Sequence, residues 1–88
     1  MAAQTPSSSS QISAKDATNR AASYAVDLLG NIHSVRLEEV ELSEDGREWL
    51  ITLSYFANTP YVFGQKEYKI FRVDAHSGEV KSMKIREV

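Results

Sequence analysis

The sequence predicts an α+β domain in which one N-terminal helix packs on a four-stranded antiparallel meander sheet. Three observations support this prediction. Residues 47–57 alternate large apolar side chains with mostly polar ones, which is the period of a strand with one buried face. Residues 13–29 are the only segment with helical periodicity, and turn signals separate the remaining extended segments. One helix laid across a small sheet covers both apolar faces.

The 88 residues have room for one domain. Residues 1–12 contain Pro6 and four consecutive serines, and such a segment buries too little apolar surface to offset its ordering entropy. We therefore expect a flexible Ser-rich tail over 1–12 and a single domain over 13–88. A core of this size rarely supplies more than ~3–5 kcal/mol, so a protein partner or a homodimer contact is expected.

The predicted helix has explicit ends. Ser13 followed by Asp16 resembles a capping box, and Gly30 fits the position where a left-handed residue ends a helix. The apolar stripe between them is rich in alanine, which lets a helix approach a sheet closely. Its members are Ala14, Ala17, Ala21, Ala25, Leu28 and Leu29.

The extended segment 33–42 changes the parity of its apolar side chains at Glu38-Glu39. A β-bulge there would keep these side chains on one face. Asp45-Gly46 predicts a type I′ turn, which fixes the register with 47–57. The resulting pairs are Leu42 with Trp49, Val40 with Ile51, Leu37 with Leu53 and Val35 with Tyr55.

Two further strands are predicted at 67–74 and 79–88, joined by a turn in which Gly78 takes positive φ and Asp74 accepts hydrogen bonds from turn amides. The parity of their apolar residues is mixed. Either another bulge exists, or the sheet is apolar on both faces and a second sheet covers the outer one. In the second case the outer patch would consist of Leu50, Phe71, Val73 and Val80.

Charge is divided along the chain, with six of the ten basic residues on the predicted second hairpin. This hairpin could bind an anion or an acidic partner, although lysines also protect solvated edge strands against aggregation. The overall net charge of −2 gives no attraction for phosphate backbones, so we expect no nucleic-acid binding. The basic residues are Lys66, Lys69, Arg72, Lys81, Lys84 and Arg86.

The sequence has no apolar run long enough to span a membrane and no signal-peptide pattern. A cytoplasmic location is the default expectation, and a mature secreted chain would have the same features. The absence of cysteine excludes disulfides and Cys-based zinc sites. No acid/base pair, activated nucleophile, phosphate loop or metal-ligand spacing can be named, so we expect a non-enzymatic protein without cofactor or metal.

Two candidate sites remain. The connection 58–65 carries Tyr61, Val62 and Phe63, with Phe56 just before it. These side chains either fold back over the open end of the core or form a contact patch for a partner. The alternative site is a small-ligand or anion pocket between helix and sheet near three large aromatic residues, Trp49, Tyr55 and Tyr68.

The C-terminal segment EYKIFRVDAHSGEVKSMKI, with Val73-Asp74-Ala75 followed by Ser77-Gly78-Glu79-Val80, resembles the hairpin that closes PepSY-type domains. The Ala-rich helix and the Trp-bearing strand precede it in a compatible order, as in cystatin-like folds more loosely. The resemblance covers about 70 residues and implies a bacterial, non-enzymatic interaction or regulatory module that modulates a partner such as a peptidase. It transfers no catalytic residue to this chain.

Overall fold

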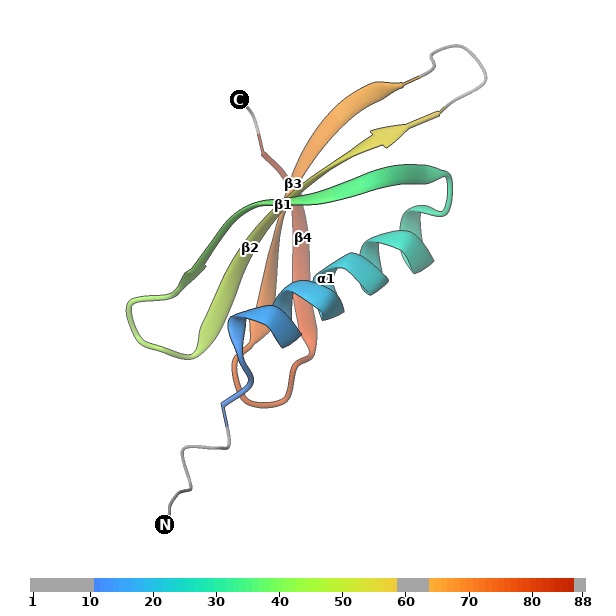
Figure 1. Cartoon of the computed structure of the whole chain (residues 1–88). Coiled ribbons are helices and arrows are strands. Elements are labelled where there is room, and N and C mark those ends of the chain that lie inside the picture. The colour runs from blue at the N-terminus through green and yellow to red at the C-terminus, as the bar shows by residue number, and fades with distance from the viewer. Residues whose placement is uncertain (1–10, 59–63, 87–88) are drawn as a thin grey trace.

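The structure is a computed structural model that describes residues 11–58 and 64–86. Within these residues the strands form one antiparallel sheet in chain order, and the helix lies across one face of it (Figure 1). The predicted α+β class and meander order are confirmed. The described residues include no helix that is long and apolar enough to cross a membrane. The elements are α1 (Ala14–Leu29), β1 (Ile32–Leu42), β2 (Glu48–Ala57), β3 (Gln65–Asp74) and β4 (Val80–Ile85).

Helix α1 begins and ends where the sequence predicts. The side chain of Ser13 accepts a hydrogen bond from the backbone N–H of Asp16 at 3.0 Å, and Gly30 adopts φ 76°. The helix is held against the sheet by three fully buried alanines, Ala17, Ala21 and Ala25.

Leu28 was expected in this buried stripe, and that expectation is wrong, since the residue is 58% exposed. The buried alanines are spaced by four residues, and the same step from Ala25 leads to Leu29. Leu29 packs against the core, whereas Leu28 lies about 100° away around the helix.

The core lies between the alanine seam of α1 and the facing side chains of β2 and β3. Ile51 and Leu53 come from β2, and Phe71 and Val73 come from β3. Trp49 flanks this cluster and donates its indole N–H to the carbonyl of Ile12 at 3.1 Å. The only tryptophan therefore ties the entry of the helix to the sheet.

The predicted register between β1 and β2 is confirmed for Leu42 with Trp49, Val40 with Ile51 and Leu37 with Leu53. The irregularity between Leu37 and Glu39 corresponds to the predicted bulge. The fourth predicted pair, Val35 with Tyr55, is not formed in the ladder, because a second irregularity interrupts β1 between His33 and Arg36. Ser34 within it has φ 57°.

The turn between β1 and β2 differs from the predicted type I′ turn, which needs positive φ at both Asp45 and Gly46. Only Gly46 has it, with φ 73°. The N–H of Gly46 bonds the carbonyl of Ser43 at 2.9 Å, and the N–H of Ser43 bonds the carbonyl of Glu48 at 2.8 Å. The Asp45 carboxylate accepts from the Ser43 hydroxyl, so side-chain bonds stabilise the longer loop without changing the register.

The turn between β3 and β4 is as predicted. Gly78 has φ 79°, and one carboxylate oxygen of Asp74 accepts the N–H groups of His76 and Ser77, each at 2.8 Å. A register shift follows Arg72, where the ladder passes from the Arg72–Ser82 pair to Val73–Val80. The bulge alternative is therefore confirmed for β4.

The outer patch of Leu50, Phe71, Val73 and Val80, which the second alternative would have required, is not formed. Phe71 and Val73 are fully buried beneath α1, and the β4 bulge turns Val80 to the same side. Leu50 does lie on the outer face, where its neighbours are Arg72 and Glu41.

Candidate interaction surface

The sheet face opposite α1 is covered by no helix or strand within the described residues (Figure 1). Even so, Thr52 and Ser54 on this face are almost completely buried. Long charged side chains fold over them. The Ser54 hydroxyl donates to Glu38 at 2.6 Å, and Arg86 donates to the Thr52 hydroxyl at 3.1 Å and to Glu39 at 2.7 Å.

The Ser54 hydrogen bond lowers the pKa of the Glu38 carboxyl below its ordinary value. Polar contacts therefore cover the centre of the outer face. This part of the face does not expose an apolar surface on which a second sheet could pack. This organisation favours a polar interface over an obligate apolar one.

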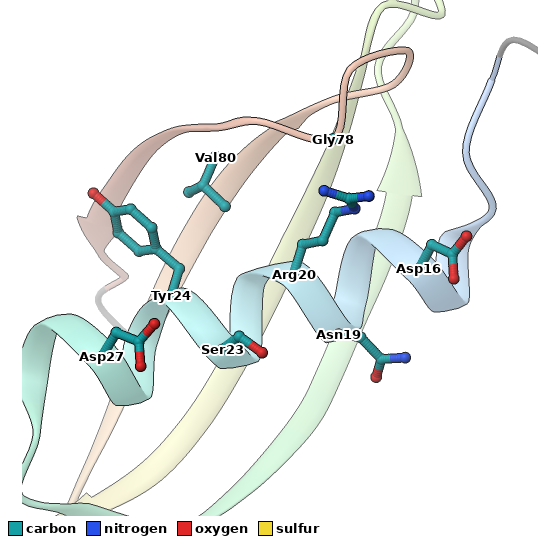
Figure 2. A pocket seen from close by; sticks show the side chains of 8 residues that line it. All are labelled: Asp16, Asn19, Arg20, Ser23, Tyr24, Asp27, Gly78 and Val80. Carbon is teal, nitrogen blue, oxygen red and sulfur yellow. The ribbon is translucent and has the colours of Figure 1, made fainter.

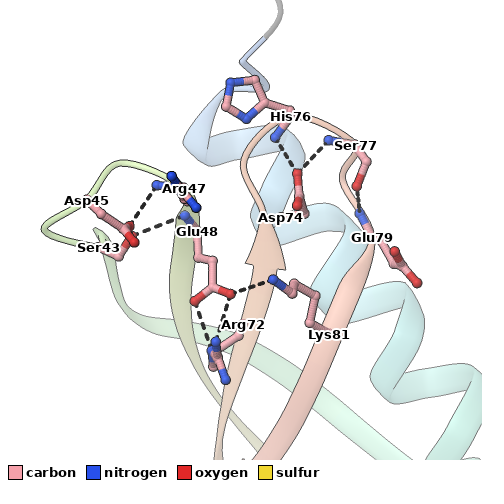
Figure 3. A network of polar contacts seen from close by, with 10 residues as sticks. All are labelled: Ser43, Asp45, Arg47, Glu48, Arg72, Asp74, His76, Ser77, Glu79 and Lys81. Carbon is pink, nitrogen blue, oxygen red and sulfur yellow. Dashed lines mark hydrogen bonds and ion pairs between the residues drawn. The ribbon is translucent and has the colours of Figure 1, made fainter.

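A second polar group lies at the end of this face next to the turns. Figure 3 shows the carboxylate of Glu48 between Arg72 and Lys81. Arg72 donates through Nε and Nη2 at 2.9 and 2.8 Å, and Lys81 Nζ lies 2.9 Å from Oε2. The hydrogen bonds from Arg72 and then Lys81 hold the pKa of Glu48 below its ordinary value. This network joins β2, β3 and β4 on one face.

The opposite end of the outer face carries two half-buried aromatic rings, Phe56 and Tyr68. The ammonium of Lys66 lies 6.0 Å from the centre of the Phe56 ring and 5.4 Å from that of Tyr68, which are cation–π distances. His33 stacks on the other side of Phe56, with ring centres 5.8 Å apart. We call Phe56, Lys66 and Tyr68 the aromatic–lysine cluster.

Tyr68 separates two hollows in the surface, each of about 290 Å³. One is bounded by Tyr68, Glu38, Glu39 and Arg86. The other lies where β4 ends beside β3, and it is lined by Gln65, Lys66, Glu67, Tyr68, Lys69, Ile85 and Arg86. A half-buried aromatic ring between two hollows is suited to insertion of side chains from a partner.

The residues of the alternative pocket are not brought together. Trp49 and Tyr55 point to the helix side of the sheet, whereas Tyr68 is paired with Ser54 and points to the outer face. Tyr55 is fully buried and donates its hydroxyl to Glu67 at 3.0 Å. Burial and the neighbouring carboxylate raise the pKa of Tyr55 well above its ordinary value of 10.

Of the predicted contact residues, Phe56 belongs to the aromatic–lysine cluster, and Tyr61, Val62 and Phe63 lie outside the described residues. Sequence reasoning did not connect Phe56 with Lys66 and Tyr68. The β2–β3 register makes this connection, because Phe56 pairs with Lys66 and Ser54 with Tyr68, which places all four on one face.

A third hollow, of about 510 Å³, lies between α1 and the turn that joins β3 to β4 (Figure 2). Figure 2 shows the guanidinium of Arg20 directed at Gly78, and a Cβ on Gly78 would lie 2.6 Å from it. Tyr24 packs edge-on against the buried ring of Phe71, 6.4 Å away. The rest of the lining is polar: Asp16, Asn19, Ser23 and Asp27, with Val80 at the sheet side.

Within residues 11–58 and 64–86, no group of three or more His, Asp or Glu side chains is placed to hold a metal ion. Comparison with protein-family models, with curated proteins and with solved structures finds no match for this chain. The site must therefore be interpreted from its own geometry.

Proposed function

We propose that this chain is a non-enzymatic interaction module that binds a protein partner through the outer face of its sheet at the aromatic–lysine cluster. The observation that carries the proposal is that the Lys66 ammonium lies within cation–π distance of both Phe56 and Tyr68, on a face that no described helix or strand covers. Aromatic side chains dominate the energetics of many interfaces, and half-buried rings lose little conformational entropy on binding.

A regulatory role, such as modulation of a peptidase, is part of the same proposal. The support for it is the resemblance of the β3–β4 hairpin to the closing hairpin of PepSY-type domains, with Asp74 and Gly78 in the roles expected for such a turn. The partner can also be a second copy of this chain, because the outer face carries acidic side chains on β1 and basic ones on β3 and β4.

The test combines Phe56→Ser with Tyr68→Ser, and its matched control is Leu28→Ser, which removes an exposed apolar side chain from the helix side. A protein retained by the immobilised wild-type chain is purified and titrated against all three chains by calorimetry. We expect the double variant to bind about thirtyfold more weakly or worse, since interface hot spots contribute ~2 kcal/mol or more. Equal binding by the double variant and Leu28→Ser would refute the proposal.

Self-association is tested with the same chains by light scattering after size exclusion. If the partner is a second copy, the wild-type mass rises from 9.8 kDa toward twice that value with concentration. The double variant then stays monomeric, and Leu28→Ser behaves as the wild type.

A second candidate is a small-anion site in the hollow between α1 and the β3–β4 turn. The guanidinium of Arg20, which lies against the buried backbone of Gly78, favours it. Titration with inorganic phosphate, followed by amide shifts of residues 78–80, separates the two candidates. Shifts that disappear in Arg20→Gln would support the anion site, and their absence in the wild type would exclude it.

A further inference from the structure

Strand β3 runs further than its neighbour β4. The ladder with β2 extends to Gln65, whereas the ladder with β4 covers Lys69 to Val73 and is followed by a single bond from Arg86 N–H to Tyr68 C=O. In the described residues no strand lies beside 65–67 on the β4 side, and Figure 1 shows β2 and β3 continuing beyond β4. Within the described residues, 65–67 of β3 therefore form a sheet edge.

The backbone parity shows which groups this edge offers. The carbonyl of Tyr68 and the N–H of Asp74 both bond residues of the β4 side. Because backbone groups alternate in direction along a strand, the N–H and C=O of Lys66 point the same way, whereas those of Glu67 point to β2. An open pair of this kind is a template for an added strand.

The hollow at this edge has a definite charge. Three basic side chains line it, Lys66, Lys69 and Arg86, against one acidic side chain, Glu67. The Glu67 carboxylate is already engaged by the Tyr55 hydroxyl at 3.0 Å and lies 3.7 Å from Lys69. Arg86 is likewise paired with Glu39 at 2.7 Å, so among the described residues the ammonium of Lys66 is the positive charge of this hollow that has no ion-pair partner.

The two sides of the edge also differ. Lys66 and Arg86 lie on the outer face with Tyr68, whereas Ile85 pairs with Lys69 and lies on the helix side. Ile85 is 73% exposed, the most exposed of the large apolar side chains in the described residues. A strand in line with β4 would place alternate side chains near the two basic groups and near Ile85.

We infer that an extended acidic peptide segment binds the free edge of β3 at residues 65–67 by strand addition, with an acidic side chain toward Lys66 and apolar ones toward Ile85. This inference rests on the proposed function, because it names the chemistry of the partner that binds beside the aromatic–lysine cluster. Main-chain bonds would supply part of the affinity, and the alternating side chains would supply the specificity.

The experiment uses the full 88-residue chain and an end-capped peptide that alternates valine and glutamate. The matched probe alternates valine and lysine. Binding is followed by amide hydrogen exchange and by NMR titration. We expect the valine–glutamate peptide to slow exchange at the Lys66 amide and to leave Glu67 unchanged, and we expect the valine–lysine peptide to do neither. A Lys66 amide that is already protected in the free chain would overturn the inference.

Two variants separate the backbone from the charge. Lys66→Ala removes the ammonium and keeps the N–H, whereas Lys66→Pro also removes an N–H that β2 does not use. We expect Lys66→Pro to bind roughly three- to tenfold more weakly than Lys66→Ala, which is the effect of one net hydrogen bond. Thermal unfolding establishes that both variants are folded. If Lys66→Pro should lose its structure, the same peptide N-methylated at alternate residues makes the comparison on the wild-type chain.

Equal affinity of the two variants, or an equal effect of N-methylation at every peptide position, would overturn strand addition. The proposed function is tested separately by the variant at Phe56 and Tyr68. Loss of partner binding there, with no pairing at Lys66, would leave the outer-face interface in place and remove only the edge.

Discussion

Arg72 binds the carboxylate of Glu48 through two parallel hydrogen bonds, Nε to Oε1 at 2.9 Å and Nη2 to Oε2 at 2.8 Å, across the β2–β3 ladder. Lys81 from β4 reaches the same carboxylate at 2.9 Å (Figure 3). The side chain of Glu48 thus links β2, β3 and β4 near the β1–β2 turn and the β3–β4 turn. β1 and β4 are the two outermost strands of the sheet and are not adjacent. The ion pair between Glu39 on β1 and Arg86 at the end of β4 connects them across the outer face.

The pH dependence of stability should report Glu48. Its pKa in the folded chain is below the ordinary value of 4.5, so the unfolded chain takes up a proton first as the pH falls. The stabilisation is present above pH 4.5 and is lost as the pH falls below that value. Thermal unfolding of Glu48→Gln should show two effects. The variant should be less stable than the wild type at neutral pH, and it should lose less stability than the wild type as the pH falls below 4.5.

The matched control is Glu44→Gln, which changes an exposed turn carboxyl on the same hairpin. Its unfolding curves should follow those of the wild type across the acid range. An identical acid response in Glu48→Gln and the wild type would contradict the role assigned to the Glu48 network.

Tyr55 should show the opposite pH dependence. Its pKa is raised in the folded chain, so above pH 10 the unfolded chain releases the phenolic proton while the folded chain retains it. Stability therefore falls as the pH rises past 10. Spectrophotometric titration should show a tyrosine that ionises above the ordinary range of the phenol, and Tyr55→Phe should lack it. A titration curve unchanged by the substitution would be incompatible with the Tyr55–Glu67 contact.

Two glycines with nearly the same φ allow backbone strain to be separated from crowding. Gly46 has φ 73° with open space around it, whereas a Cβ on Gly78 would lie 2.6 Å from the guanidinium of Arg20. Gly46→Ala should destabilise by about 1–2 kcal/mol, the typical cost of a left-handed L-residue. Gly78→Ala should cost about the same in chemical denaturation, because the added Cβ meets only the far end of the flexible, exposed Arg20 side chain, and adding Arg20→Ala should leave this cost unchanged.

A larger loss in Gly78→Ala that Arg20→Ala relieves would contradict this expectation and would mean that the Arg20 side chain is held against the turn. In that case the second candidate site between α1 and this turn would gain support.

The alanine seam should not accept larger side chains. Ala21 is fully buried between α1 and the sheet, so Ala21→Leu should destabilise by about 1–3 kcal/mol through overpacking. Lys15→Leu, on the exposed side of the same helix, is the control and should change stability by no more than ~0.5 kcal/mol. Denaturant unfolding measures both. Tolerance of leucine at position 21 would mean that the helix is not closely packed on the sheet.

The sequence by itself determined the elements whose signals are local. Ser13 and Gly30 fixed the ends of the helix because capping depends on the few residues at each terminus. The change of parity at Glu38-Glu39 determined a bulge, and with it three of the four predicted pairs, since a strand with one buried face allows only one register. Asp74 and Gly78 likewise determined their turn.

Only the tertiary structure decided which face of β3 is the core. Tyr68 and Ile70 alternate with Phe71 and Val73, so apolar residues on both faces make the pattern ambiguous, and the choice depends on the partner strands. Pairing of Phe71 with the buried Ile51 turns Phe71 toward α1 and leaves Tyr68 on the outer face.

The candidate surface follows from the same choice. The register of β2 with β3 brings Phe56, Lys66 and Tyr68 together, and within the described residues β3 extends beyond β4 because the two ladders end at different points. No local pattern encodes such a difference in length. It results from long-range pairing, in which β3 pairs with β2 as far as Gln65 but with β4 only as far as Lys69.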